Sequence, residues 1–509
     1  MKFRALLPLA VVVTSLAPAS ALSARQTVQE SIDFSMAQMI REEGLERSHV
    51  AELVGYLTDV IGPRLTGSSG MKRANEWTAD QFREWGLTNV KVEPWGEFGR
   101  GWERVEYMGR IVTPFVQPLD AHPMAWSGST NGTVRGPAVV LDISDTTDLA
   151  RYRGQLRGAF VLVREAVDME PEWAQTQAPR RFTLGHLFDS VPPPRRPRTI
   201  IHREREPLSR REFPAVMRFL EREQVAAYLQ PSSWQYSVLL VSGMPGGAGR
   251  RPDAGEPTPG LSVSHEQYGE IYRNVKRGVP VELEVRVTNR FLDDDLQAYN
   301  SLGDIGGTDL VDQVVMLGAH LDSWHSGTGA TDNAAGSAVM MEAMRILRAL
   351  GIRPRRTIRI ALWSGEEQGL LGSRAWVRNH EDELDHISAY VNVDNGTGRI
   401  RGLYDQGNTA AAPIFEQILS PMRDLGVMTV RHQEVGGTDH LAFDRVGVPG
   451  FNFTQDPIEY SVRTHHSNID TYDHLVIDDL KQAATVVAWT VYNLAMRDQM
   501  IPRKAPPVQ

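Results

Sequence analysis

The C-terminal half of the chain alternates short apolar runs with longer amphipathic segments. Three of the apolar runs have the length of buried strands and lie at residues 314–320, 357–363 and 389–394. Apolar residues at helical spacing predict helices at residues 334–350, directly after Glu367, at 412–425 and at 478–496. Strands that alternate with helices predict an α/β fold, in which helices cover both faces of a mostly parallel mixed sheet.

The first part of the chain beyond residue 30 is predicted to be helical. Helical periodicity extends from residue 31 to about residue 61, and a loop follows at residues 62–70. An amphipathic helix that ends near Trp85 comes next, followed by a strand near residues 90–93. We assign these elements to the same domain as the C-terminal half.

The pattern changes between about residues 118 and 260, where short strand-like runs alternate with turns. This segment contains the proline-rich stretch 191–198 and ends in a stretch rich in glycine and proline. Such a texture predicts a mainly β domain. We therefore expect an inserted domain at residues 118–260, which separates the two parts of the main domain at residues 25–117 and 261–509.

The N-terminus has the features of a secretory signal peptide. Lys2 and Arg4 precede an apolar run, and residues 19–21 form an A-x-A cleavage site. A membrane anchor is the competing interpretation, but Pro8 interrupts the run, which is too short to span a bilayer. We expect residues 1–21 to be removed and the soluble protein to be exported to the periplasm or the medium.

Composition excludes several kinds of site. None of the 509 residues is a cysteine, so disulfides, thiolate zinc sites and cysteine nucleophiles are excluded. The net charge is −9 and no long basic face occurs, which argues against a nucleic-acid partner. The folded chain must be held together by its apolar core and by any metal that it binds.

Acidic and imidazole side chains follow each of the predicted central strands. They are His320 and Asp322 after the first strand, Asp332 before the next helix, Glu366 and Glu367 after the second strand, Asp394 after the third, and His466 in a late loop. Ligands of an open α/β sheet bind outside the carboxyl ends of its strands, so these side chains are expected to meet there.

Each of these residues has an ordinary structural interpretation when it is taken alone. A strand-end histidine is usually hydrogen-bonded, an aspartate before a helix is usually an N-cap, and two adjacent glutamates favour the first turn of a helix. Together, however, several acids and imidazoles at buried strand ends need a common neutraliser, which a pair of divalent cations supplies. Imidazole and carboxylate ligands without thiols suit zinc, with cobalt or manganese as substitutes.

The motif series HLDSW, GATDNAAG, SGEEQG, NVDNGTG and HHSNID resembles that of a known family of zinc exopeptidases. It is similar to the di-zinc aminopeptidase and glutamate carboxypeptidase family (peptidase family M28), and with the GPRLTGS loop it most resembles the carboxypeptidase Q branch. The resemblance covers nearly all of the mature chain. It implies the zinc exopeptidase fold, and it implies that residues 118–260 are a protease-associated-type cap domain.

The resemblance also implies a metal-ligand set with two Zn²⁺ ions per chain. Asp332 would bridge the two ions. His320 and Asp394 would complete one site, and Glu367 and His466 would complete the other.

Three further residues take catalytic roles by the same resemblance. Glu366 would be the general base that takes a proton from a metal-bound water. Asp322 would orient His320, and His465 would donate to the oxyanion at a position that is often tyrosine in the family.

The expected function is therefore an exported di-zinc exopeptidase that hydrolyses dipeptides or short peptides. The resemblance favours carboxypeptidase or dipeptidase activity, with aminopeptidase activity as the alternative. A single-zinc glutaminyl cyclase and a non-catalytic binding protein are more distant alternatives, and a homodimer is left open. Arg401, Tyr404 and Arg463 are candidates for binding an end of the substrate, and residues 436–443 are expected to line the pocket.

Overall fold

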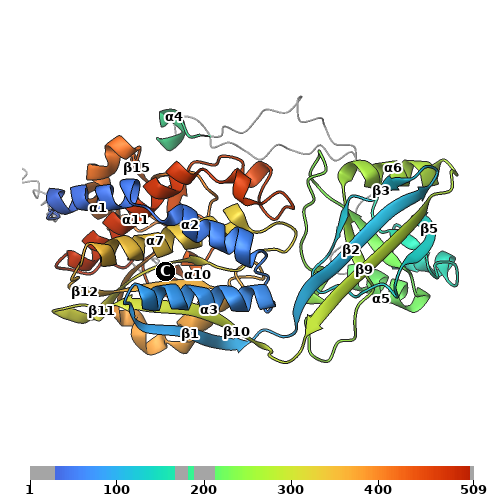
Figure 1. Ribbon diagram of the computed structural model, residues 1–509, viewed down its shortest axis with the longest axis horizontal. Helices are drawn as coiled ribbons and strands as arrows, with labels where there is room; N and C mark the ends of the chain where they lie inside the picture. The colour runs from blue at the N-terminus through green and yellow to red at the C-terminus, as the bar shows by residue number, and fades with distance from the viewer. Residues whose placement is uncertain (1–28, 167–180, 189–211, 505–509) are drawn as a thin grey trace, which may run out of the picture.

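The computed structural model describes residues 29–166, 181–188 and 212–504, which form two eight-stranded sheets with their helices (Figure 1). The expected signal peptide at residues 1–21 and the proline-rich stretch 191–198 lie outside these ranges. Within them, no helix is both long and apolar enough to cross a membrane.

The first sheet contains the strands expected from the C-terminal half of the sequence. In spatial order they are β1 (Thr88–Glu97), β10 (Gln297–Ile305), β12 (Arg356–Trp363), β11 (Leu310–His320), β13 (Ile387–Asn392), β16 (Gly450–Gln455), β14 (Ile400–Tyr404) and β15 (Thr429–Arg431). The central strands β12, β11, β13 and β16 run parallel, whereas β1, β10 and β12 are antiparallel neighbours and β14 is antiparallel to β16. The expectation of a mostly parallel mixed sheet in an α/β fold is confirmed.

Helices cover both faces of this sheet (Figure 1). One apolar cluster joins the sheet to α1 (Phe34–Glu46), α2 (Val50–Gly55), α7 (Ala335–Ala349), α9 (Ala412–Leu419) and α11 (Ile477–Met496). A second cluster joins it to α8 (Leu371–Asn379) and α10 (His440–Asp444). Along β12, Ile358 and Ile360 face the first cluster, and Ala361 and Trp363 face the second. This alternation is expected of a strand that is buried on both sides.

The single helix expected at residues 31–61 is instead three segments. They are α1, α2 and a π-helical segment at Tyr56–Ile61, and α3 (Ser69–Glu84) follows the loop. The break after α1 is held by α7, because His49 donates its main-chain N–H to Glu342 and Arg345 donates to the carbonyl of Arg47. Side chains far away in the sequence therefore replace the helical hydrogen bonds at residues 47–49.

The second sheet extends beyond the inserted domain that the sequence predicted. In spatial order it contains β3 (Gln117–Pro118), β2 (Gly101–Thr113), β9 (Glu282–Leu292), β5 (Val134–Val140), β6 (Phe160–Leu162), β7 (Ala227–Pro231), β8 (Gly260–Val263) and β4 (Ala121–Pro123). The helices α5 (Phe213–Glu223) and α6 (His265–Lys276) belong to this part of the chain. The predicted boundaries at residues 118 and 260 are therefore too narrow. The strands β2 and β9, which pair along their length, extend the second unit to residues 101–292.

The two sheet units share a packed interface next to the late loop that carries His466. Trp102 and Trp126 of the second unit belong to one apolar cluster with Trp95 and Ala375 of the first. Val241 donates its main-chain N–H to the carbonyl of His466 at 3.1 Å. The second unit therefore contributes directly to the position of the His466 loop.

Residues 181–188 follow the second unit's β6 in sequence but lie against the first sheet unit. Arg181 pairs with the buried carboxylates of Asp456 and Asp479, at 3.1 and 2.5 Å. The short helix α4 (Leu184–Leu187) follows directly and lies near β15 (Figure 1).

Candidate active site

The polar side chains at the strand ends lie close together, as the sequence predicted. His320 is the last residue of β11, and Glu366 and Glu367 follow the end of the neighbouring strand β12. Asp394 follows β13 on the other side of β11. Asp332 lies in the π-helical segment Ala330–Ala334, which leads into α7.

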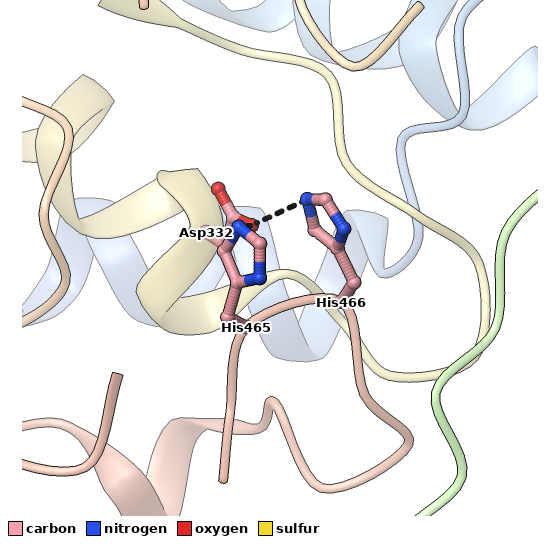
Figure 2. Close-up of side chains that lie close together, drawn as sticks. All are labelled: Asp332, His465 and His466. Carbon is pink, nitrogen blue, oxygen red and sulfur yellow. Dashed lines mark ion pairs between the residues drawn. The ribbon is translucent and has the colours of Figure 1, made fainter. Parts of the chain in front are cut away.

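Asp332 lies between two groups of donor atoms. Its Oδ1 is 3.3 Å from His320 Nε2, which is itself 3.4 Å from Asp394 Oδ1. On the other side, Asp332 Oδ2 is 3.3 Å from His466 Nε2, which is 2.9 Å from Glu367 Oε2 (Figure 2 shows the pair of Asp332 and His466). The five residues expected as metal ligands therefore form one contiguous cluster with Asp332 at its centre.

Several polar atoms of this cluster are buried without a hydrogen-bond partner among the described residues. They are His320 Nε2, Asp332 Oδ2 and Glu367 Oε1. Two triads, His320–Asp332–Asp394 and Asp332–His465–His466, each have ligand atoms within 4.8 Å of one another. Unpaired buried polar atoms are costly, so a cluster of imidazole and carboxylate atoms with this geometry fits cations.

Burial changes the protonation of the two adjacent glutamates. Burial raises the pKa of Glu366 well above its usual value, and the charge on Asp394 adds to this effect although His320 opposes it. Burial also raises the pKa of Glu367, with a contribution from Asp332. A nearby cation would stabilise the ionised form of both side chains.

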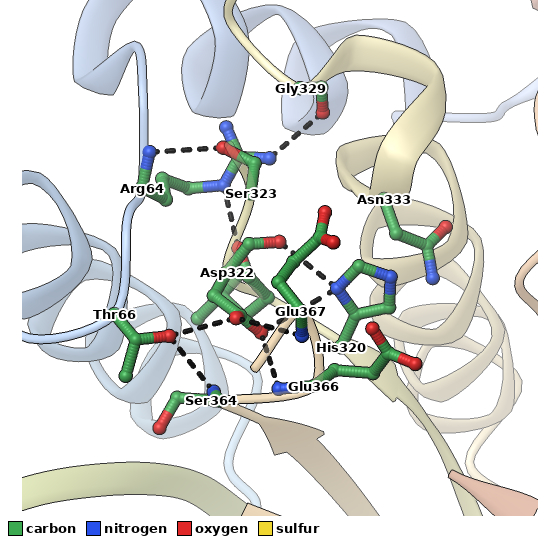
Figure 3. A network of polar contacts seen from close by, with 12 residues as sticks. Arg64, Thr66, His320, Asp322, Ser323, Gly329, Asn333, Ser364, Glu366 and Glu367 are labelled. Carbon is green, nitrogen blue, oxygen red and sulfur yellow. Dashed lines mark hydrogen bonds and ion pairs between the residues drawn. The ribbon is translucent and has the colours of Figure 1, made fainter. Parts of the chain in front are cut away.

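The carboxylate of Asp322 fixes the loop that carries these glutamates (Figure 3). It accepts hydrogen bonds from the main-chain N–H groups of Glu366 and Glu367, at 3.3 and 3.4 Å, and from the hydroxyl of Thr66 at 2.8 Å. The ring of His320 lies 3.0 Å from the carbonyl oxygen of Asp322 and 3.5 Å from its carboxylate. The nearer partner of His320 Nδ1 is thus the main chain of Asp322, and its carboxylate also holds the glutamate loop.

The loop at residues 62–70, which carries the GPRLTGS motif, packs beneath the site. Arg64 is fully buried and donates five hydrogen bonds to the main-chain carbonyls of Leu57, Gly62, Leu321, Thr328 and Gly329. Thr66 accepts a hydrogen bond from the N–H of Gly365 at 3.0 Å in addition to its bond to Asp322. The loop therefore connects the end of β11 to the loop after β12.

Asp470, in the late loop, holds the main chain at Asp332 in place. Its two carboxylate oxygens accept the main-chain N–H groups of Thr331 and Asp332, at 2.7 and 3.1 Å. Burial, together with the charge of Asp332, raises the pKa of Asp470 to about 7. The late loop thus contributes His466 to the cluster and supports the backbone of Asp332.

A cavity of about 360 Å³ opens onto the cluster. Its lining comprises Asp332, Glu366, Glu367, Gly369, Leu370, Arg374, Asp394, Gly437, Leu441, Arg445, Tyr460, His465 and His466. Gly437 and Leu441 belong to the segment 436–443, which the sequence analysis expected at the pocket. Glu366 lies at the wall of this cavity beside the donor cluster.

His465 and Tyr460 present polar atoms to the same cavity. The ring of His465 stacks on His466 with centroids 3.7 Å apart, and its Nε2 is 3.9 Å from Asp332 Oδ2. The hydroxyl of Tyr460 is 3.5 Å from Asp394 Oδ1, and its ring packs edge-on against His465. Tyr460 was not among the residues predicted from the sequence, because no motif marks it and it lies six residues before His466.

The residues expected to bind a substrate end are not in the cavity lining of the described chain. Arg401 pairs with Asp456, and Tyr404 lies under the guanidinium of Arg431. Arg463 does not line the cavity either. The arginines that do line it are Arg374 and Arg445. Neither was predicted from the sequence, because an arginine on a helix or at its end usually belongs to the solvent-exposed surface.

The amino-acid sequence is similar to a known protein family and to individual known proteins. The family model of Peptidase family M28 matches residues 300–491, which include the whole donor cluster. Carboxypeptidase Q from Rattus norvegicus is 26% identical over 457 residues, covering 89% of this chain and 86% of the relative. Carboxypeptidase Q from Homo sapiens is 26% identical over 463 residues, covering 90% of this chain and 88% of the relative.

Two solved structures share the fold. A Peptidase M28 precursor from Shewanella amazonensis SB2B has a TM-score of 0.68 at 23% identity, covering 93% of this chain and 99% of that chain. BSAP, a zinc aminopeptidase from Bacillus subtilis, has a TM-score of 0.58 at 19% identity, covering 89% of this chain and 97% of that chain. Residues 300–491, which carry the site, thus match Peptidase family M28, and the chain is similar to carboxypeptidase Q along both sheet units.

Proposed function

We propose that this protein is an exported, zinc-dependent exopeptidase that hydrolyses dipeptides or short peptides from the carboxypeptidase or dipeptidase side. The observation that carries the proposal is the position of Asp332 between two groups of buried donor atoms, next to a cavity lined by Glu366. The direction of cleavage is carried over from the relatives named carboxypeptidase Q. Export is carried by the signal-like residues 1–21.

The donor set fits two zinc ions that share Asp332. His320 and Asp394 would hold one ion, and Glu367 and His466 would hold the other. The buried atoms that lack hydrogen-bond partners belong to this set, so binding would satisfy them. Cobalt or manganese would be accepted by the same imidazole and carboxylate ligands.

The side chains around the cavity have different roles in the proposed peptide hydrolysis. When bound, the zinc ions would supply polarisation of the scissile carbonyl and would lower the pKa of the attacking water. The carboxylate of Glu366 takes a proton from that water and passes it to the nitrogen of the leaving amine. Burial raises the pKa of Tyr460 well above its usual value, so its hydroxyl keeps its proton and, with His465, donates towards the carbonyl oxygen.

The second sheet unit is proposed to act as a cap that limits the cavity to short substrates. Its support is the contact between Val241 and the His466 loop, together with the shared tryptophan cluster. A glutaminyl cyclase with one zinc ion is disfavoured, because His320 and Asp394 are both present beside Asp332 and provide for a second ion.

The test uses purified full-length mature protein loaded with zinc and one dipeptide in three forms. The forms have both ends free, an acetylated N-terminus, or an amidated C-terminus, and products are identified by mass spectrometry. Cleavage of the free and acetylated forms indicates a carboxypeptidase, and cleavage of the free form alone indicates a dipeptidase. Cleavage of the free and amidated forms alone would make it an aminopeptidase, and cleavage of none would contradict the proposed function.

A further inference from the structure

Two arginines line the active-site cavity without an acidic partner. Arg374 lies in the first turn of α8, and Arg445 directly follows α10. Neither side chain forms a hydrogen bond or an ion pair with another described residue, whereas the neighbouring Asp444 is paired with Lys504 at 2.5 Å. Both guanidinium groups are exposed and available to a ligand.

The elements that carry these arginines are fixed to each other. Ser373, next to Arg374, donates its hydroxyl to the carboxylate of Asp439 at 2.5 Å, and Asp439 directly precedes α10. The rings of Trp376 in α8 and Phe443 in α10 pack with centroids 5.8 Å apart. The two side chains therefore extend into the cavity from a rigid base.

The charges around the cavity leave these two cations unbalanced. The acids of the lining are Asp332, Glu366, Glu367 and Asp394, and they belong to the cluster proposed to hold zinc. Other arginines of the first unit are neutralised by acids, as Arg359 is by Asp304 and Glu383. A pair of unneutralised guanidinium groups in a substrate cavity is suited to a planar anion, because the donors of arginine match the two oxygens of a carboxylate.

The position of the arginines indicates which part of a substrate they meet. The cavity wall continues along the chain from Glu366 through Gly369 and Leu370 to Arg374. In the proposed reaction Glu366 delivers a proton to the leaving amine, so the released residue lies on the Glu366 side of the scissile bond. The carboxylate of that residue would extend along this wall towards the guanidinium groups.

We propose that Arg374 and Arg445 form the subsite that binds a carboxylate of the residue released from the substrate. This inference rests on the proposed function and adds to it a preference for substrates whose released residue carries a carboxylate. The carboxylate could be the free α-carboxylate of a C-terminal residue or the side-chain carboxylate of an acidic residue, and the two sources are separated by substrate design. Binding of the α-carboxylate makes the enzyme act only where the released residue is the last one of the peptide.

The test compares wild type with Arg374→Gln, Arg445→Gln and the corresponding lysine variants on Ala-Ala, Ala-Ala amide and Ala-Glu amide. Each glutamine variant is expected to lower kcat/KM on Ala-Ala by about tenfold or more, because a charged hydrogen bond is lost. The amide should change much less, and lysine should restore part of the rate. Arg378→Gln is the matched control, since Arg378 is exposed one turn further along α8 and does not line the cavity.

The substrates also identify the source of the carboxylate. A preference for Ala-Ala over its amide that disappears in the glutamine variants supports the α-carboxylate, and a variant-sensitive preference for Ala-Glu amide over Ala-Ala amide supports the side chain. Equal cleavage of all three by wild type, or equal loss on all three in the variants, would overturn the subsite. Rates on the control variant and thermal unfolding curves show whether a loss of activity reflects misfolding. If a glutamine variant misfolds, the lysine variant, which keeps the positive charge, tests the subsite in its place.

A binding measurement separates this subsite from the proposed function. Zinc-loaded Glu366→Gln protein is titrated with Ala-Ala and with its amide by calorimetry. Tighter binding of Ala-Ala that is lost on adding Arg374→Gln supports the subsite even if wild type cleaves none of the peptides. Equal binding of the two peptides overturns the subsite even if wild type is an active peptidase.

Discussion

At the scale of single residues, Glu366 and Glu367 show how adjacent identical side chains acquire different surroundings. Both donate their main-chain N–H groups to Asp322, which holds the loop in one conformation. Both line the cavity, but Glu367 contacts His466 at 2.9 Å, whereas no ion pair joins Glu366 to an imidazole among the described residues. The different roles proposed for them follow from this difference.

The first prediction separates chemistry from metal binding. Glu366→Gln is expected to lower kcat by roughly 10²- to 10⁴-fold, since an amide cannot accept the proton of the attacking water. Zinc content, measured by atomic emission on dialysed protein, should stay at the wild-type value because Glu366 is not among the proposed ligands. Glu381→Gln, an exposed change elsewhere, is the control. Loss of zinc from the Glu366 variant would move this residue into the ligand set.

Asp332 gives the complementary prediction. Asp332→Asn is expected to reduce the zinc content by both ions and to abolish activity, because its two oxygens face the two separate donor groups at 3.3 Å each. Asp394→Asn is the matched comparison and should affect mainly the ion held with His320. Retention of one tightly bound zinc in the Asp332 variant would show that the two sites are independent of this carboxylate.

At the scale of secondary-structure elements, the sequence predicted the central strands and the clustering of the polar side chains that follow them. This part of the prediction is confirmed because β11, β12 and β13 each contain an apolar run and because parallel strands end at the same edge of the sheet. It could not find Arg374, since an exposed arginine on a helix usually marks a solvated face. It also could not find the break after α1, because His49 is held there by Glu342, far away in the chain.

The next prediction concerns Thr66 in the loop at residues 62–70 and its effect on zinc affinity. Thr66→Val removes the hydroxyl that bridges the carboxylate of Asp322 and the N–H of Gly365, which connects the ends of β11 and β12. We expect zinc affinity, measured by competition with a chelator, to fall about 10- to 100-fold, as for other residues that support metal ligands. Thr66→Ser keeps the hydroxyl and should bind zinc like wild type. Equal affinities of the valine and serine variants would contradict this role for the loop.

At the scale of the whole molecule, the sequence predicted two domains but not where they meet. Most residues of β2 are partly or fully exposed, and β9 alternates buried residues with more exposed ones. Their polar residues therefore do not show, without knowledge of the pairing partners, that the two strands belong to the second sheet. The contact between Arg181 and the buried Asp456 likewise joins residues 275 positions apart. Such pairings are set by tertiary packing, which a local pattern does not contain.

The interface between the two units contains a buried histidine, His325, whose titration is expected to make the stability of the folded protein depend on pH. His325 follows β11, and its Nε2 donates to the carbonyl of Pro123 in β4 at 2.8 Å while its ring packs edge-on against Trp102. Its Nδ1 is buried without a hydrogen-bond partner among the described residues. Burial lowers the pKa of His325 to about 3, so the ring stays neutral in the folded protein.

The last prediction follows from the sign of this shift. Above pH 6.5 the ring is neutral in both the folded and the unfolded chain, and protonation has no effect on stability. As the pH falls from 6.5 towards 3, only the unfolded chain binds the proton, so stability decreases, by about 2 kcal/mol at pH 5 from this residue. Urea unfolding midpoints at pH 7.5 and pH 5 measure the loss.

His325→Gln tests whether the interface histidine causes this loss. Glutamine keeps an N–H donor for Pro123 but cannot titrate, so the variant should be less stable than wild type at pH 7.5 yet lose less stability on acidification. Zinc release at low pH would destabilise both proteins equally and therefore cancels in the comparison. His122, whose pKa is also lowered by burial, to about 4, remains in both proteins and accounts for part of the shared loss. An identical acid-dependent loss in wild type and variant would place the pH sensitivity elsewhere, and a smaller loss in the variant would assign it to the contact that joins the two units.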